Sequence, residues 1–275
     1  MYNLFTVVQL IIIILNTPSD TLNISSDTKI FLPMVSVTPP KVGYAYSEMS
    51  EENTRLLHMQ WYHNWNMSIA HSNIERVEHF SCEVRPYWTF DDDARNQFTD
   101  LRRIVARFGD APFYLIFLNE PDLNEQCSRT PSHAAQMYKK VIEIAPNAII
   151  IGPQVSDQDY LNDWAWLKEF YRYLDRMNLP YPQIGAIHSY LEEPPNNIVE
   201  SYFNLPFSTS KIWIAEFGAT NPETLRNFLL YYQSDPRIER YSYFAPIHTK
   251  DWSRYELVDE DGNLNDMGRV WVELH

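Results

Sequence analysis

Cysteine is scarce in this chain of 275 residues, which contains only Cys82 and Cys127. Two cysteines exclude a disulfide-dense scaffold and any metal site built from several thiolates. Each follows a predicted strand, so the two could meet and form a bridge, or they could remain unpaired thiols. The patterns CxxC, HExxH, GxGxxG and GxxxxGKS/T, which bind metals, dinucleotides or nucleotide phosphates, are also missing. We therefore expect no metal and no organic cofactor.

Basic residues are also few. The chain has 22 basic against 36 acidic residues, a net charge of -14 at pH 7, and no run of Lys or Arg. Nucleic acid is excluded as a partner, because phosphate binding needs a basic surface. No stable protein partner is indicated, and we expect a monomer. Aromatic residues, in contrast, make up 15% of the chain, enough to exclude disorder and to leave some rings for a binding surface.

The N-terminus carries the apolar run FTVVQLIIIIL at residues 5 to 15, followed by a polar segment to about residue 28. The run is shorter than the about 20 residues that cross a bilayer, but it suits the core of a signal peptide. No basic residue precedes it and no clear cleavage site follows, so an uncleaved anchor or a wrongly assigned start are the alternatives. We expect export and an extracellular protein, with residues 1–28 outside the fold and one catalytic domain at 29–275.

Eight short apolar runs, rich in β-branched and aromatic residues, are typical of strands buried on both faces. They span residues 42–47, 57–65, 77–86, 113–120, 148–156, 184–190, 211–218 and 240–247. Segments with helical spacing and terminal Pro or Gly lie between several of them, at 91–109, 131–146, 159–178 and 221–236. This alternation predicts an α/β fold, a single (β/α)8 TIM barrel, with an open doubly wound sheet as the alternative. Function should then lie at the carboxyl ends of the strands.

Polar residues collect at those ends. Asn119 and Glu120 close the fourth predicted strand, His188 and Tyr190 the sixth, and Glu216 lies in the seventh. Two carboxylates facing one barrel mouth suit glycoside hydrolysis, in which one protonates the leaving oxygen and the other attacks the anomeric carbon. A separation of about 5 to 5.5 Å would indicate retention of configuration. The competing interpretation makes both glutamates members of structural ion pairs.

Four motifs in this order resemble the clan A (β/α)8 glycoside hydrolases, most closely the Asl1-like glycosyl hydrolase catalytic domain, glycoside hydrolase family 128. They are Trp61–Trp65 (WYHNW), Leu118–Asp122 (LNEPD), Ile187–Tyr190 (IHSY) and Trp213–Gly218 (WIAEFG). The resemblance covers roughly residues 40 to 275 and implies cleavage of β-1,3-glucan with retention of configuration. The chain departs from the family at Ala215 and in the stretch 241–244, which leaves the sugar platform and the glucan less defined than the carboxylate pair.

Carried over by motif, Glu120 would be the general acid/base and Glu216 the nucleophile. Asn119 would then hydrogen-bond the sugar 2-hydroxyl. His188 and Tyr190 would orient Glu216 or contact the sugar, although His188 could equally be a buried supporting residue. For this chemistry the pKa of Glu120 should be raised and Glu216 should be ionised.

Several aromatic residues could stack on a sugar ring, because an apolar ring matches the CH face of a pyranose. Asn64 with Trp65 would border the cleft, and Tyr46, Trp88 and Phe244 complete the expected substrate-binding residues. The wider set of candidate platforms includes Trp61, Trp164, Trp166 and Trp252, of which Trp164 and Trp166 lie in a helical pattern, so that one or both should pack against the barrel.

Two other functions remain open at this point. A hydrolase of the same clan acting on mannan, xylan or β-1,4-glucan would keep both glutamates and change only the platforms. A non-catalytic glycan-binding barrel would bind oligosaccharide without turnover, although a pure binder has no need of intact catalytic carboxylates.

Overall fold

Nine parallel strands form the centre of the fold in the part of the chain that the computed structural model describes, residues 41–45, 49–65, 67, 74–81, 90–246 and 252–275. They are β1 (Val42–Ala45), β2 (Trp61–His63), β3 (Glu75–Arg76), β4 (Glu78–Phe80), β5 (Phe113–Asn119), β6 (Ala148–Gln154), β7 (Gly185–Ser189), β8 (Ile212–Phe217) and β9 (Ile238–Phe244). Each predicted run overlaps an observed strand; the third, predicted at 77–86, contains β4, and the short strand β3 lies just before it, separated from β4 by Val77. All described residues belong to one compact unit, Thr38–His275. The predicted N-terminal export segment, Tyr46, Cys82 and Trp88 lie outside the described residues.

The strands pair in two groups. One has the order β3-β2-β1-β9-β8-β7 and the other β4-β5-β6, and every pair of neighbouring strands is parallel. The first and last strands are neighbours, with Gly43 of β1 opposite Ser242 of β9. The parallel α/β architecture expected from the sequence is therefore confirmed.

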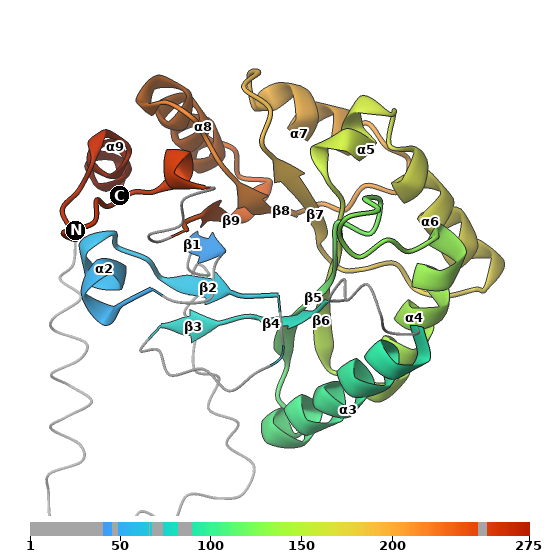
Figure 1. The fold of residues 1–275 in the computed structure, drawn as a ribbon. Helices are drawn as coiled ribbons and strands as arrows, with labels where there is room; N and C mark the ends of the chain where they lie inside the picture. The colour runs from blue at the N-terminus through green and yellow to red at the C-terminus, as the bar shows by residue number, and fades with distance from the viewer. Residues whose placement is uncertain (1–40, 46–48, 66, 68–73, 82–89, 247–251) are drawn as a thin grey trace, which may run out of the picture. The chain divides into compact units, whose positions relative to one another are not determined.

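Helices alternate with the strands and lie on their outer side in Figure 1. They are α2 (Glu51–Leu56), α3 (Phe90–Phe108), α4 (Pro131–Ile144), α5 (Asp157–Leu161), α6 (Ala165–Arg176), α7 (Asn196–Phe203), α8 (Pro222–Ser234) and α9 (Asp266–Leu274), with a short 3-10 helix η1 (Ser253–Tyr255). Side-chain caps begin several of them: Thr130 accepts a hydrogen bond at the start of α4, and Asn221 does so for α8. A proline in the first turn of both helices suits a position that needs no intrahelical donor.

The single helix predicted at 159–178 is wrong in one respect, because the chain breaks it into α5 and α6. Asp163 and Trp164 both adopt left-handed backbone angles, with φ of 54° and 56°. The buried carboxylate of Asp159 then accepts the backbone N–H groups of Trp166 and Leu167, at 2.8 and 3.1 Å, and so caps a new helix. The periodic apolar pattern continues across the break, which is why the sequence did not show it.

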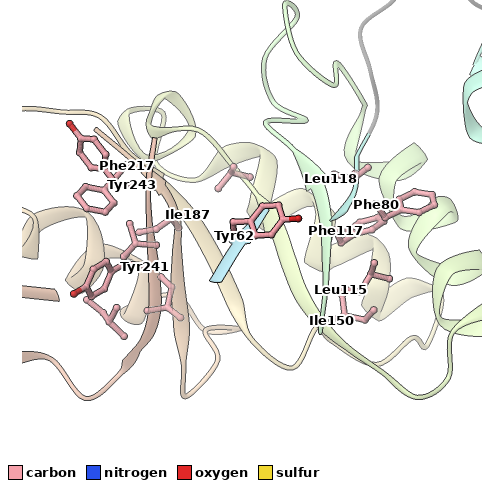
Figure 2. Close-up of a cluster of buried hydrophobic side chains, with 14 of the residues drawn as sticks. Tyr62, Phe80, Leu115, Phe117, Leu118, Ile150, Ile187, Phe217, Tyr241 and Tyr243 are labelled. Carbon is pink, nitrogen blue, oxygen red and sulfur yellow. The ribbon is translucent and has the colours of Figure 1, made fainter. Parts of the chain in front are cut away.

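The core divides according to the alternating faces of the strands. On β5, Leu115 and Phe117 belong to a large cluster that includes residues of the helices, whereas Ile116 belongs to a smaller one. Figure 2 shows part of the large cluster, with Phe80, Phe117 and Ile150 together and Ile187, Phe217 and Tyr241 grouped on other strands. The smaller cluster is Trp61, Val77, Ile116, Ile151, Ile184, Ala186, Trp213 and Ala215. The strands are thus buried on both faces, as their apolar composition predicted.

A buried guanidinium lies near the beginning of the strands. Arg240 is only 1% exposed and pairs with Glu75 at 3.1 Å. Its Cζ lies over three rings, at 4.6 Å from Tyr114, 4.8 Å from Trp213 and 5.4 Å from Trp61. An ion pair and cation–π contacts together compensate for the removal of this charge from water.

Trp271 should anchor the C-terminal helix, because its indole is fully buried and donates to Leu57 O at 2.8 Å. Replacing it with Ala should lower the free energy of unfolding by about 3 to 5 kcal/mol, through lost burial and a cavity. Urea denaturation measures this value. Glu273→Ala on the exposed side of the same helix is the control and should have a far smaller effect; equal effects of both variants would contradict this role of Trp271.

Candidate active site

The predicted site residues meet at the carboxyl ends of the strands. Asn119 ends β5 and Glu120 follows it, His188 lies in β7, and Glu216 in β8. Since all the strands are parallel, these ends lie on the same side of the fold. Direct contacts between side chains then decide which residues form one site.

Glu216 is held by two donors from other strand ends. The hydroxyl of Tyr190 donates to Oε1 at 2.6 Å, and the indole Nε1 of Trp65 donates to Oε2 at 3.1 Å. Burial, the largest influence, raises the pKa of Glu216, whereas His188 and these two hydrogen bonds favour the carboxylate. Burial thus disfavours the ionised form of Glu216 that we expected, whereas His188, Tyr190 and Trp65 favour it.

Glu120 lies at a strained point of the backbone. Its φ is 41°, and Leu118, two residues earlier, has a φ of 58°, both in the left-handed region that side chains rarely adopt. The register of β5 against β6 shifts here, as in a β-bulge. The N–H of Glu120 donates to Gln154 O at 2.7 Å, which ties the turn to the next strand. Strain of this kind persists only where neighbouring contacts enforce it, and it is common at functional sites.

His188 lies between the two glutamates and is fully buried. Its Nδ1 is 2.9 Å from Glu120 Oε1, and its Nε2 is 3.8 Å from Glu216 Oε2. Burial lowers the pKa of His188, but the carboxylates of Glu216 and Glu120 outweigh it and raise the pKa to about 9. The two glutamates therefore converge on one imidazole, which has no surface left for a ligand.

Aromatic rings continue outward from Glu216. Phe244, at the end of β9, has ring-centroid distances of 6.3 Å to Trp65, 6.1 Å to Tyr190 and 5.8 Å to Tyr255. Gly218 leaves the space that this packing needs, because a Cβ there would lie 2.8 Å from Tyr255 and 2.9 Å from Tyr190. The Glu-Phe-Gly sequence thus positions a carboxylate and makes room for the tyrosine that binds it.

The two predicted asparagines have different surroundings. Asn64 is half-buried and accepts a hydrogen bond from Arg76 Nη2 at 3.2 Å. Asn119 is 8% exposed, and its Oδ1 has no hydrogen-bond donor among the described residues. Asn119 therefore retains an acceptor beside Glu120.

The structure separates the candidate tryptophan platforms. Trp61 is fully buried in the smaller core cluster. Trp164 donates to Ser201 Oγ at 2.8 Å, and Trp166 donates to Arg129 O at 2.7 Å and stacks on Phe170, so both pack within the fold as expected. Trp252 is 44% exposed and has its ring 5.6 Å from that of Phe244.

Two residues near the glutamates were not among those that the sequence indicated. Gln154 ends β6, and its Oε1 lies 3.3 Å from His188 Nε2. Asp157 accepts a hydrogen bond from the backbone of Tyr190, and burial raises its pKa. Gln154 lies in the predicted run 148–156, at the end of β6, and Asp157 follows that run directly. The rule that found the other residues, a polar group at a strand end, could therefore have found Gln154.

Other expected features of the site can be described briefly. Cys127 is 1% exposed and is disulfide-bonded; Cys82, the other cysteine of the chain, lies outside the described residues. Over the described ranges no group of three or more His, Cys, Asp or Glu side chains could hold a metal ion. Nor is any helix within those ranges long and apolar enough to cross a membrane.

A parallel α/β fold with two carboxylates close together at its strand ends is typical of glycoside hydrolases. A family model described as the glycosyl hydrolase catalytic core matches residues 42–271, and the chain belongs to this family. The resemblance noted in the sequence is therefore confirmed. No curated protein matches the chain.

Solved structures share the fold at low sequence identity. One is a GH128 subgroup II endo-β-1,3-glucanase from Pseudomonas viridiflava, 21% identical with a TM-score of 0.66, covering 86% of this chain and 98% of its own. Another is a subgroup I endo-β-1,3-glucanase from Amycolatopsis mediterranei in complex with laminaritriose, at 15% identity and a TM-score of 0.65, covering 86% and 100%. A third is a subgroup VII oligosaccharide-binding protein from Trichoderma gamsii, at 16% identity and a TM-score of 0.63, covering 86% and 93%.

Removal of the Tyr190 hydroxyl should raise the pKa of Glu216 further, because the lost hydrogen bond favoured the carboxylate. A shift of about one pH unit is expected for Tyr190→Phe, measured by carbon-13 NMR titration of labelled glutamate. Tyr232→Phe is the matched control, since Tyr232 is also buried but donates to Ser189 Oγ. A Glu216 midpoint that stays constant or falls in Tyr190→Phe would show that this contact does not control the carboxylate.

Proposed function

We propose that the protein is a retaining glycoside hydrolase that cleaves β-1,3-glucan by double displacement, with Glu216 as nucleophile and Glu120 as general acid/base. The observation that carries the proposal is the convergence of buried Glu216 and partly buried Glu120 on His188 at the carboxyl ends of parallel strands. Family membership and the fold shared with GH128 β-1,3-glucanases support the reaction class and the substrate.

We further propose that the strands close into one (β/α)8 barrel. Only Val77 separates β3 from β4, and its N–H donates to Tyr62 O of β2 at 2.9 Å. Parallel bridges from Ile151 to Ile184 and from Val155 to Ile187 connect β6 with β7. These links connect the two groups of strands at both of their edges, as a closed barrel requires. The smaller core cluster contains residues of β2, β5, β6, β7 and β8, as the interior of such a barrel would.

In the first step Glu120, protonated, gives its proton to the glycosidic oxygen, and the C–O bond breaks with its electron pair going to that oxygen. A carboxylate oxygen of Glu216 forms the new bond to the anomeric carbon. In the second step the Glu120 carboxylate takes a proton from water, the water oxygen attacks the anomeric carbon, and Glu216 leaves as a carboxylate. Two inversions give net retention, and no cofactor takes part.

The remaining contacts follow from the surroundings of the pair. The free Oδ1 of buried Asn119 is available to accept a hydrogen bond from the sugar 2-hydroxyl. Trp65 and Phe244 present rings beside Glu216, and Tyr190 orients its carboxylate. We retain Asn64 as a residue at the cleft border, and Tyr46 and Trp88 as proposed contacts from outside the described residues.

A non-catalytic glycan-binding barrel is the second candidate, favoured by one observation. The protein from Trichoderma gamsii with the same fold is named an oligosaccharide-binding protein. Against this stands the arrangement of Glu216, because burial of its carboxylate costs free energy that a binder need not spend. Two hydrogen bonds nevertheless favour its charged form, as a nucleophile requires. A hydrolase of mannan, xylan or β-1,4-glucan remains the third possibility, and we propose an exported monomer in every case.

Release of reducing sugar from linear β-1,3-glucan, compared with β-1,4-glucan, mannan and xylan, tests the proposal. The wild-type chain should act on β-1,3-glucan alone, and Glu216→Ala and Glu120→Ala should each lose at least about 100-fold in kcat/KM. Glu125→Gln is the control, since Glu125 is exposed in the loop after β5. Release from another glycan would replace the substrate, whereas binding without release would favour the non-catalytic barrel.

The stereochemical course is a separate prediction. Proton NMR of the earliest products should show the β-anomer before mutarotation, because the attack of Glu216 and the later attack of water each invert the centre. An initial α-anomer would indicate a single displacement and would remove Glu216 from the role of nucleophile. A high enzyme concentration keeps the reaction faster than mutarotation, and a substrate of short, defined length gives resolved anomeric signals.

A further inference from the structure

Both nitrogens of the His188 ring face oxygen atoms. Nδ1 lies 2.9 Å from Glu120 Oε1, and Nε2 lies 3.3 Å from Gln154 Oε1 and 3.8 Å from Glu216 Oε2. Carboxylate and amide carbonyl oxygens accept hydrogen bonds, and a neutral imidazole has only one N–H to donate. A neutral ring that donates to Gln154 would need the Glu120 proton at Nδ1, where it could not be given to a leaving oxygen. A doubly protonated ring donates to both sides and leaves the Glu120 proton available to the substrate.

Gln154 contacts both His188 and Glu120. Its backbone oxygen accepts the Glu120 N–H at 2.7 Å, while its side-chain oxygen accepts from His188 Nε2. The residue is fully buried at the end of β6 and lies opposite Asn119 in the β5–β6 register. Gln154 therefore has no route to a substrate and can act only through its neighbours.

The groups around His188 favour its positive charge. Carboxylates face it from three elements: Glu120 and Asp122 after β5, Asp157 at the start of α5, and Glu216 on β8. The other imidazoles near it do not oppose the charge. Burial lowers the pKa of His63 on β2 to about 3 and that of His79 on β4 well below the usual value, so both are neutral.

We propose that Gln154 is a positioning residue that keeps His188 doubly protonated, so that a fixed positive charge stands between Glu120 and Glu216. This inference deepens the proposed function and rests on it for its meaning in catalysis. As Glu216 bonds to the anomeric carbon, it loses its negative charge, and Glu120 gains one on giving up its proton to the leaving oxygen. The charge moves from one side of His188 to the other, and returns in the second step.

A fixed imidazolium serves both steps for that reason. It favours the carboxylate of Glu216 before attack and the carboxylate of Glu120 after proton delivery, so the net charge of the three groups is the same before and after each step. A neutral His188 would leave the buried site with an uncompensated carboxylate throughout. Gln154 supplies a neutral acceptor, which holds the Nε2 proton without adding negative charge that would repel the glutamates.

Nitrogen-15 NMR titration of the imidazoles tests this directly and needs no substrate. In the wild-type chain, His188 should be doubly protonated at pH 7 and titrate at about 9. Gln154→Met, which retains size but lacks the acceptor, should lower this midpoint by about one pH unit. Gln154→Glu, which restores an acceptor and adds a negative charge, should return the midpoint to the wild-type value or above it.

The controls separate a positioning role from a general loss of structure. His188→Gln assigns the signal by its absence, and Gln126→Met, in the exposed loop after β5, should leave the midpoint unchanged. A His188 that is neutral at pH 7 in the wild-type chain, or one midpoint for all Gln154 variants, would overturn the inference. If the midpoints move as expected but no glycan is cleaved, the proposed function fails while the role of Gln154 in setting the charge of His188 stands.

Discussion

A buried carboxylate, that of Glu216, lies near the partly buried carboxylate of Glu120, and the charge of His188 between them makes this arrangement favourable. Burial and mutual repulsion both disfavour the ionised form of Glu216, and the pKa of that group is raised accordingly. The imidazole, with its own pKa raised to about 9 by the same carboxylates, supplies the opposing charge. Tyr190 and Trp65 donate hydrogen bonds to the carboxylate of Glu216 and fix its orientation, which they can do because His188 compensates the charge of that carboxylate.

The backbone contributes as much to the site as the side chains do. Left-handed angles at Leu118 and Glu120 each cost about 1 to 3 kcal/mol. Full burial of Leu118 and the hydrogen bond from Glu120 to Gln154 offset this cost. Since the turn is held from both sides, the backbone itself places the Glu120 carboxyl against His188.

The sequence predicted the strands well, because apolar runs with β-branched residues need burial on both faces and parallel pairing provides it. The glutamates were found because Glu120 and Glu216 lie at equivalent places on two predicted strands, and because the motifs around them resemble a known family. Gln154 was missed since it is polar but uncharged, and its importance depends on a partner 34 residues away. The break between α5 and α6 was missed because Asp159 caps α6 through space while the apolar spacing continues.

Arg240 and its aromatic neighbours hold the strands at the end opposite the glutamates. Trp213 and Glu216 share β8, yet the first belongs to this anchoring group and the second to the proposed catalytic pair. On β8, residues near the beginning of the strand therefore stabilise the fold, and the proposed catalytic residue lies near its carboxyl end. The loops that follow the strands could therefore be changed by mutation to accept a different sugar chain. The Arg240 cluster at the opposite end would still hold the strands together.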